Sequence, residues 1–369
     1  MVVASDAFKG SLTSLEVGDA VRLGLLDVAP HAEVVVVPVA DGGEGTVAAA
    51  LASGWAGVAA DVHGPTGEPV SATLAGRGTT VLVEMADACG LGRLPDAVPA
   101  PLTASSRGLG EAILAALDLG AAEIIVGVGG SASTDGGAGL LRALGARLLD
   151  VDGVDLPDGG AALAGLAHLD LTGLDPRLTT TRLVLAADVD SPLLGPGGAA
   201  AVFAPQKGAT AAEVAQLEAA LAHWATTVEA HPWMPGAGAA GGVGFALLAV
   251  LGAQRASGVD VVLDLVGLDS ALTGADLVVT GEGSLDAQTL AGKAVRGVAQ
   301  RAAANGIPVV AVCGRLALDD ADLSALGVRA AYPLSDLEAD PRRSIEDAAA
   351  LLRRVGQQLA REWFSRPPG

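Results

Sequence analysis

Short apolar runs alternate with amphipathic stretches along most of the chain, and this rhythm predicts parallel strands joined by helices. Six such runs each end in a cluster of glycine or aspartate, and they lie at 2–5, 34–39, 123–128, 183–187, 276–280 and 307–312. Strands that are apolar on both faces are typical of parallel sheets with helices on both sides. Ligands bind outside the carboxyl ends of such strands. The pattern therefore predicts an α/β protein whose Gly, Asp, Ser and Lys residues meet at a ligand site.

The stretch 57–86 departs from this rhythm. Strand-like runs follow one another there without a helix between them, at 58–62, 70–74 and 80–84, and proline or glycine residues separate them. This pattern is typical of antiparallel hairpins. We therefore expect a second domain to begin near residue 60. The length of 369 residues also favours more than one domain.

Composition excludes several classes of protein. The 22 basic and 42 acidic residues give a formal net charge of −20. The sequence therefore indicates no basic surface of the kind that binds nucleic acid. Cys89 and Cys313 lie far apart in sequence, which indicates neither a disulfide framework nor a zinc motif. We find no basic leader and no apolar run of the roughly 20 residues that span a bilayer. We expect a cytoplasmic protein with no membrane partner.

Lysine is scarce in this chain. Of the 22 basic residues only Lys9, Lys207 and Lys293 are lysine, and each has a glycine beside it. Lysine offers a compact charge that suits a phosphate oxygen, and a neighbouring glycine lets the backbone approach a ligand closely. Solvated loop lysines are the alternative interpretation. Because all three share the same setting, we predict that they bind phosphate.

Glycine-rich turns and acidic residues follow several of the predicted strands. Turns at 41–45, 127–137 and 281–284 can present backbone N–H groups to an anion, although each could also be a plain tight turn. Phosphoryl transfer needs Mg²⁺, which one or two carboxylates hold together with phosphate oxygens. Asp188 and Asp190 follow a buried strand, and Glu282 lies in the third turn. Helix capping is the alternative role for each acid, and Asp188 is the preferred metal ligand.

Six motifs together resemble the bacterial glycerate kinase family, in particular the type 1 glycerate 2-kinases, and they occur in the family's order. They are DAFKGSL at 6–12, PVADGGEGT at 38–46, GGSASTDGGAG at 129–139, FAPQKGA at 203–209, GAGAAGG at 236–242, and TGEG at 280–283 followed by Asp286, Gln288 and Lys293. The resemblance covers nearly the whole chain, and all three lysines fall inside it.

The resemblance implies ATP-dependent phosphorylation of D-glycerate, usually at the 2-hydroxyl, with Mg²⁺ as the metal ion. It also implies two α/β domains with the active site in the cleft between them. A flavodoxin-like domain with a parallel sheet is expected from residues 1–60 and 275–369, and a mixed-sheet insertion from residues 61–274. Whether the chain forms a homodimer stays open.

From these motifs we assign roles by residue. We predict that Lys9, Lys207 and Lys293 neutralise phosphate charge, and that Asp188 binds Mg²⁺ with Asp190 or Glu282 as further candidates. Asp41 or Asp188 would accept the proton of the substrate hydroxyl. The turns expected to hold phosphates or the substrate carboxylate contribute Gly129, Gly130, Ser131, Gly281, Glu282 and Gly283. The alternatives are a kinase for another small sugar acid and a non-catalytic nucleotide-binding regulator.

Overall fold

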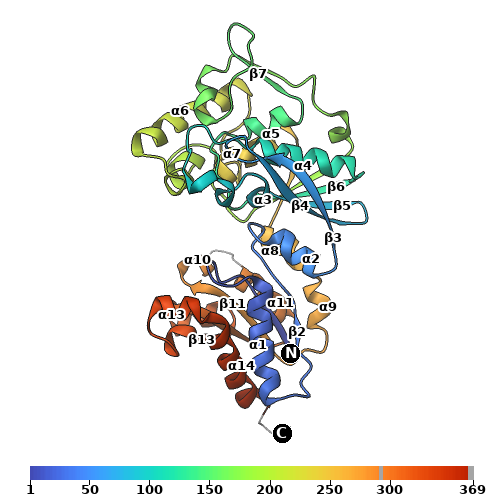
Figure 1. Ribbon diagram of the computed structural model, residues 1–369, viewed down its shortest axis with the longest axis vertical. Coiled ribbons are helices and arrows are strands. Elements are labelled where there is room, and N and C mark those ends of the chain that lie inside the picture. Colours follow the sequence, from blue (N-terminus) through green and yellow to red (C-terminus); the bar gives the residue numbers. More distant parts are fainter. Residues whose placement is uncertain (291–293, 365–369) are drawn as a thin grey trace. The chain divides into compact units, whose positions relative to one another are not determined.

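The computed structural model describes residues 1–290 and 294–364, and Figure 1 shows its helices and strands. The chain divides into two compact units, each of which contains a sheet and helices. Unit 1 comprises Met1–Asp41, Ala48–Gly54 and Val259–Gly369, and unit 2 comprises Gly42–Val47 and Trp55–Gly258. The chain therefore starts in unit 1, passes through unit 2 and returns.

The sheet of unit 1 consists of five parallel strands. Their order is β13 (Val328–Pro333), β12 (Val309–Leu316), β11 (Val278–Leu285), β1 (Val2–Ser5) and β2 (Val35–Val36). Numbered along the chain within this sheet, the order is 2-1-3-4-5, which is the flavodoxin-like order. The expected flavodoxin-like parallel sheet is confirmed, and its strands come from both ends of the chain.

Alternate residues of these strands face opposite layers of helices. Val3 and Val279 pack with helices α1 (Ser14–Val28) and α14 (Ala348–Phe364). Val2 and Val278 pack on the other face with α8 (Gly258–Leu265), α9 (Leu268–Leu272) and α11 (Ala294–Ala304). The shorter helices assigned to this part of the chain are α10 (Ala287–Leu290), α12 (Asp320–Ala325) and α13 (Pro341–Glu346). Both faces are covered, as the apolar runs in the sequence predict.

Helices α1 and α14 approach each other closely because each has a glycine at the contact. A Cβ on Gly24 would lie 1.9 Å from the carbonyl oxygen of Arg353, and one on Gly356 would lie 2.3 Å from that of Val21. Thr13 and Glu16 form a capping box at the start of α1. Close packing of these helices fixes the first and last segments of the unit against the same face of the sheet.

The sheet of unit 2 is mixed. Its strand order is β10 (Gln254–Ala256), β9 (Arg182–Ala186), β6 (Glu123–Gly127), β5 (Thr80–Glu84), β4 (Pro69–Arg77) and β3 (Ala56–His63). Strands β3, β4 and β5 pair antiparallel, which confirms the hairpins expected in this stretch, and the remaining pairs are parallel. A separate antiparallel pair joins β7 (Arg147–Leu149) to β8 (His168–Asp170).

One large core holds the sheet of unit 2 against its helices, which are α3 (Met85–Cys89), α4 (Arg107–Asp118), α5 (Ala138–Ala143), α6 (Ala211–Thr227) and α7 (Ala239–Phe245). Trp224 of α6 is fully buried, and its ring meets Phe245 edge-on with centroids 6.2 Å apart. The Trp224 indole N–H donates to the carbonyl oxygen of Gly136 at 3.1 Å. This bond fastens α6 to the glycine-rich loop that follows β6.

The division into units differs from the expected domain boundaries in detail. Helices α8 and α9 pack in unit 1, although the expected insertion of residues 61–274 includes them. The segment Gly42–Val47, at the start of α2 (Thr46–Ala52), groups with unit 2. Within the described residues, no helix combines the length and the apolar character of a membrane span.

Candidate functional site

The sheet of unit 1 has a point at which its strand order reverses, between β1 and β11. The chain leads from β1 to β2 on one side, and β11 begins the run of strands on the other side. In open α/β sheets the crevice outside the carboxyl ends of the strands at this point is the usual ligand site. The segment that follows β1 and the last part of β11 border a pocket of about 340 Å³. All of the residues that line this pocket belong to unit 1.

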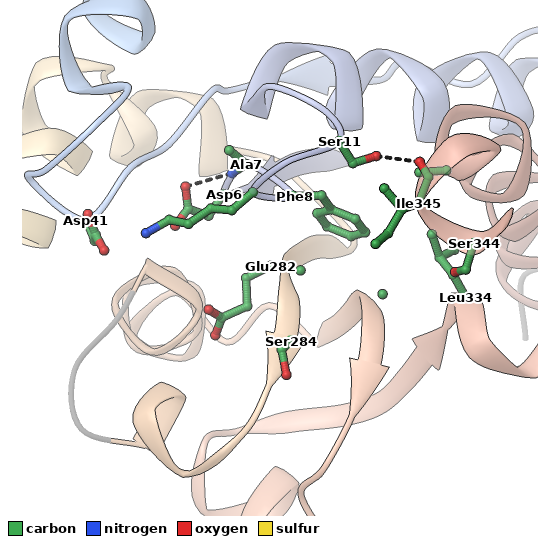
Figure 2. Close-up of a pocket in the computed structure, with 14 residues that line it drawn as sticks. Asp6, Ala7, Phe8, Ser11, Asp41, Glu282, Ser284, Leu334, Ser344 and Ile345 are labelled. Atoms are coloured by element: carbon green, nitrogen blue, oxygen red, sulfur yellow. Dashed lines mark hydrogen bonds between the residues drawn. The ribbon is translucent and has the colours of Figure 1, made fainter. Parts of the chain in front are cut away.

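One end of this pocket is acidic. Asp6, Asp41 and Glu282 line it, and Figure 2 shows their carboxylates on the same side of the Phe8 ring. Burial raises the pKa of the Asp6 carboxyl to about 7, and the negative charge of Asp41 adds to the rise. The Ala7 N–H, which donates to Asp6 at 2.7 Å, lowers the pKa in part. The pocket thus holds an acid that can exchange a proton near neutral pH.

Lys9 lines the same pocket and is exposed. It lies in a tight turn in which the Phe8 N–H donates to the Leu12 carbonyl oxygen, and Gly10 takes a left-handed φ of 78°. The Lys9 charge lowers the pKa of Asp6 in part, which indicates that the two side chains lie near each other. The turn therefore presents a cation beside the carboxylates.

The other end of the pocket is apolar. Phe8, Leu334 and Ala348 are buried there, whereas Ile345 is 54% exposed. The Ser11 hydroxyl donates to the carbonyl oxygen of Ile345 at 2.8 Å and so ties the end of α13 to the turn that follows β1. The pocket therefore has a charged half and an apolar half on one rigid frame.

The glycine-rich loop of unit 2 is closed by its own interactions. Lys207 is 2% exposed, and its ammonium donates to the Ser131 hydroxyl at 2.7 Å and to the Ser133 carbonyl oxygen. Burial lowers the pKa of Lys207 to about 7, and the charge of Asp135 offsets the effect in part. The Asp135 carboxylate accepts hydrogen bonds from the N–H and hydroxyl of Ser106 and from the N–H groups of Gly137 and Gly139. In this structure Lys207 stabilises the loop, and its contact with a phosphate stays a prediction.

Gly129 and Gly130, two more predicted glycines of this loop, have different surroundings. A Cβ on Gly129 would lie 2.4 Å from the Cα of Gly43, so only glycine fits there. Gly130 is exposed and has a left-handed φ of 70°. Close packing against Gly43 explains why residue 129 is glycine, so a ligand at its amide is not required to explain it.

Asp188 and Asp190, the predicted metal ligands, have different surroundings. The Asp188 carboxylate accepts a hydrogen bond from the Gly258 N–H at 2.9 Å. Asp190 is 81% exposed at its side chain and forms an ion pair of 2.6 Å with Arg255. Within residues 1–290 and 294–364, no cluster of three or more His, Cys, Asp or Glu side chains is arranged to hold a metal ion.

Glu84, at the end of β5, is a buried acid that the sequence analysis does not single out. It is 6% exposed and accepts hydrogen bonds from the N–H groups of Gly45 at 3.0 Å and Val47 at 2.9 Å. Burial raises the pKa of Glu84 to about 7 despite these two bonds. Glu84 thereby binds the end of the ADGGEGT motif and the first turn of α2, within unit 2.

The predicted residues thus fall into separate groups. The unit 1 pocket brings together Lys9, Asp41, Glu282 and Gly283, and Gly281 precedes the last two in β11 without lining the pocket. Unit 2 contains Lys207, Ser131, Gly129, Gly130, Asp188 and Asp190. Lys293 lies outside the described residues. Asp6 was not predicted from the sequence as a site residue, although it follows the apolar run 2–5 as Asp41 and Glu282 follow the runs 34–39 and 276–280.

Comparison with known proteins gives a consistent result. The signature of the glycerate kinase family matches residues 1–364. The chain is 43% identical over 368 residues to a glycerate kinase from Bacillus subtilis, covering 98% of this chain and 96% of that protein. It is also 43% identical over 340 residues to a glycerate 2-kinase from Escherichia coli, covering 90% and 89%. A solved structure from Salmonella typhimurium LT2, described as a candidate glycerate kinase 2, superposes with a TM-score of 0.83 at 40% identity and covers 99% of this chain and 98% of its own.

Proposed function

The chain belongs to the glycerate kinase family, and from this premise we propose that it transfers the terminal phosphoryl group of ATP to D-glycerate, giving 2-phosphoglycerate. Relatives named glycerate kinase and glycerate 2-kinase support the reaction and its product. The observation that carries the proposal is the pocket at the carboxyl ends of β1 and β11, where Lys9 lies beside three carboxylates. Phosphoryl transfer depends on positioning and on charge stabilisation, and this pocket offers groups for both.

We propose that Lys9 stabilises negative charge on the phosphoryl oxygens as it develops during transfer. Its side chain is exposed, so it is available to a ligand. The prediction that Asp41 or Asp188 accepts the hydroxyl proton stands. Asp6 joins them as a candidate because a carboxyl with a pKa of about 7 is matched to proton transfer at neutral pH. Lys207 is proposed to act through the loop that it stabilises.

We propose that Mg²⁺ accompanies ATP. The residues fit this ion, because Mg²⁺ prefers oxygen ligands and takes only one or two carboxylates, with phosphate and water completing its shell. Asp188 is the proposed protein ligand in unit 2, and Glu282 is the candidate in unit 1. Asp190 is the weaker candidate because Arg255 neutralises its carboxylate. When bound, the ion would neutralise charge on the phosphates.

A coupled assay tests this function directly. The chain is incubated with MgATP and D-glycerate, and enolase is added without phosphoglycerate mutase. Immediate product formation is expected and identifies 2-phosphoglycerate. A signal that appears only after mutase is added would instead mean transfer to the 3-hydroxyl.

The same assay, with ADP release as its readout, separates the alternatives. Turnover with other small sugar acids but not with glycerate would identify an aldonate-type kinase. Nucleotide binding with no ADP release from any acid would indicate a regulator. Use of ATP is also the basis on which we propose a cytoplasmic location. Whether the chain forms a homodimer stays open, and the mass of the purified chain in solution tests it.

A further inference from the structure

We propose that the pocket of unit 1 is the nucleotide site, with the purine base in its apolar half beside Phe8 and Ile345 and the phosphates directed toward Lys9. This inference rests on the proposed function, which requires ATP but does not say where ATP binds. It assigns the two halves of one pocket to the two chemically different halves of one ligand.

The size and lining of the pocket favour a nucleotide over glycerate. Glycerate is a three-carbon acid, whereas the volume of about 340 Å³ falls in the range of about 300–1,000 Å³ that is typical of drug-sized ligands. Glycerate also has no apolar face with which to cover Ile345, the exposed apolar side chain at this end of the pocket. A planar purine covers such a surface and leaves its polar edges free.

Ile345 provides the second argument. It is 54% exposed, although its neighbours in the pocket lining, Leu334 and Ala348, are 1% and 2% exposed. Figure 2 shows its side chain on the side of Phe8 that faces away from the acids. Covering an exposed apolar side chain is favourable because it removes apolar surface from water. A base lying against Ile345 would gain this contribution.

The charges at the other end point to a ligand that carries its own cation. Among the described lining residues Lys9 is the one basic side chain, and it stands beside Asp6, Asp41 and Glu282. A bare carboxylate such as glycerate would meet three acids and one lysine. A nucleotide bound with a divalent cation brings positive charge to the acids and phosphate oxygens to Lys9.

Gly283 lines the pocket, and packing does not require a glycine there. Its φ lies outside the left-handed region, and a Cβ there would meet the Cα of Phe8 at 3.6 Å, an ordinary contact. Gly281, two residues earlier, differs because a Cβ there would lie 2.2 Å from the Val312 carbonyl oxygen. Packing therefore requires glycine at 281 but not at 283. A methyl group at 283 would fit the fold and occupy the pocket.

The test compares Ile345→Ala, Gly283→Ala and a matched control, Leu23→Ala, which removes a similarly exposed side chain from α1 outside the pocket. Calorimetry measures the binding of MgADP and of magnesium tripolyphosphate, which lacks a base. I345A is expected to weaken MgADP about tenfold and to leave tripolyphosphate unchanged. G283A is expected to weaken both, and L23A neither, with unfolding midpoints close to wild type in all three.

Two results would overturn the inference. If I345A raises the KM for glycerate and leaves MgADP binding intact, the pocket binds the acid substrate. If I345A weakens MgADP and tripolyphosphate equally, or weakens neither, the base does not lie against Ile345. Failure of the proposed function is a separate outcome, since wild-type protein that makes no phosphoglycerate can still show the expected MgADP differences.

Discussion

The pocket of unit 1 and the glycine-rich loop of unit 2 contain the same types of residue but differ in the burial and hydrogen bonding of their lysines. Both follow parallel strands and combine glycine, acidic residues and a lysine. Lys9 is exposed beside acids in a pocket, whereas Lys207 is buried with its ammonium bound to Ser131 and Ser133. The same residue types can therefore be accessible to a ligand or be hydrogen-bonded to one another within the fold.

The largest expected effect is the loss of turnover caused by Lys9→Met in the open pocket of unit 1. Removing a charge that stabilises the transition state costs about 10²–10³-fold in kcat. Because Lys9 is exposed, its loss is expected to change the free energy of unfolding by less than about 0.5 kcal/mol. Arg22→Met on α1, a partly exposed cation outside the pocket, is the control. Steady-state kinetics and urea unfolding measure both quantities, and a K9M variant with full turnover would remove Lys9 from the mechanism.

The same substitution at the closed site, Lys207→Met, is expected to act mainly on stability. It leaves the Ser131 hydroxyl and Ser133 carbonyl without their donor and the buried Asp135 charge without its cation. Removing one partner of a buried charge pair costs about 3–5 kcal/mol. We expect a loss near the lower value because Asp135 keeps four other hydrogen bonds.

Urea unfolding followed by tryptophan fluorescence measures this loss. K9M is the matched variant, with the same chemical change at an exposed position. If K207M unfolds like wild type but loses turnover, Lys207 belongs with Lys9 as a phosphate ligand, and the contrast between the two regions fails.

How far the sequence predicts the site follows from the same contrast. Periodicity locates β1, β6 and β11 and therefore the acids at their carboxyl ends, because strand ends follow from local pattern. Pattern does not reveal that Gly129 packs on Gly43, or that Gly283 is free to carry a methyl group. Those facts depend on segments distant in sequence. Motifs therefore indicate candidate residues, and packing shows what each of them does in the fold.

Glu84 and Ile345 were missed for a related reason. Glu84 ends an ordinary strand, and its role arises from the backbone N–H groups of Gly45 and Val47, which lie far from it in sequence. Ile345 lies in a helix near the C-terminus and reaches the pocket because Ser11 binds its carbonyl oxygen. No local pattern encodes such contacts between distant segments.

A third, somewhat smaller effect concerns the buried acid of unit 2. The pKa of Glu84 rises from 4.5 to about 7 on folding, so the folded chain holds a proton that the unfolded chain releases between these values. Stability from Glu84 is fully present below pH 4.5 and is lost as pH rises toward 7, by roughly 3 kcal/mol. Glu84→Gln, which cannot ionise, is expected to remove this loss.

Urea unfolding of wild type and E84Q at pH 5 and pH 8 measures the difference between the two pH dependences. The pKa of Asp6 is also raised to about 7, but Asp6 is present in both proteins and cancels in the comparison. Identical pH dependences would show that Glu84 is ionised in the folded protein throughout, with its two N–H donors outweighing burial.

The smallest expected effect separates two acids that look alike in sequence. Asp190 is 81% exposed and paired with Arg255, and exposed ion pairs contribute about 0–1 kcal/mol. Asp190→Asn is therefore expected to lower stability by less than about 0.5 kcal/mol and to leave the Mg²⁺ concentration for half-maximal turnover within about twofold of wild type. Asp188→Asn provides the contrast, because a lost carboxylate ligand would raise that concentration. If D190N raises this Mg²⁺ concentration more than D188N does, Asp190 leaves Arg255 to bind the metal. The ion pair between Asp190 and Arg255 would then not exclude Asp190 as a metal ligand.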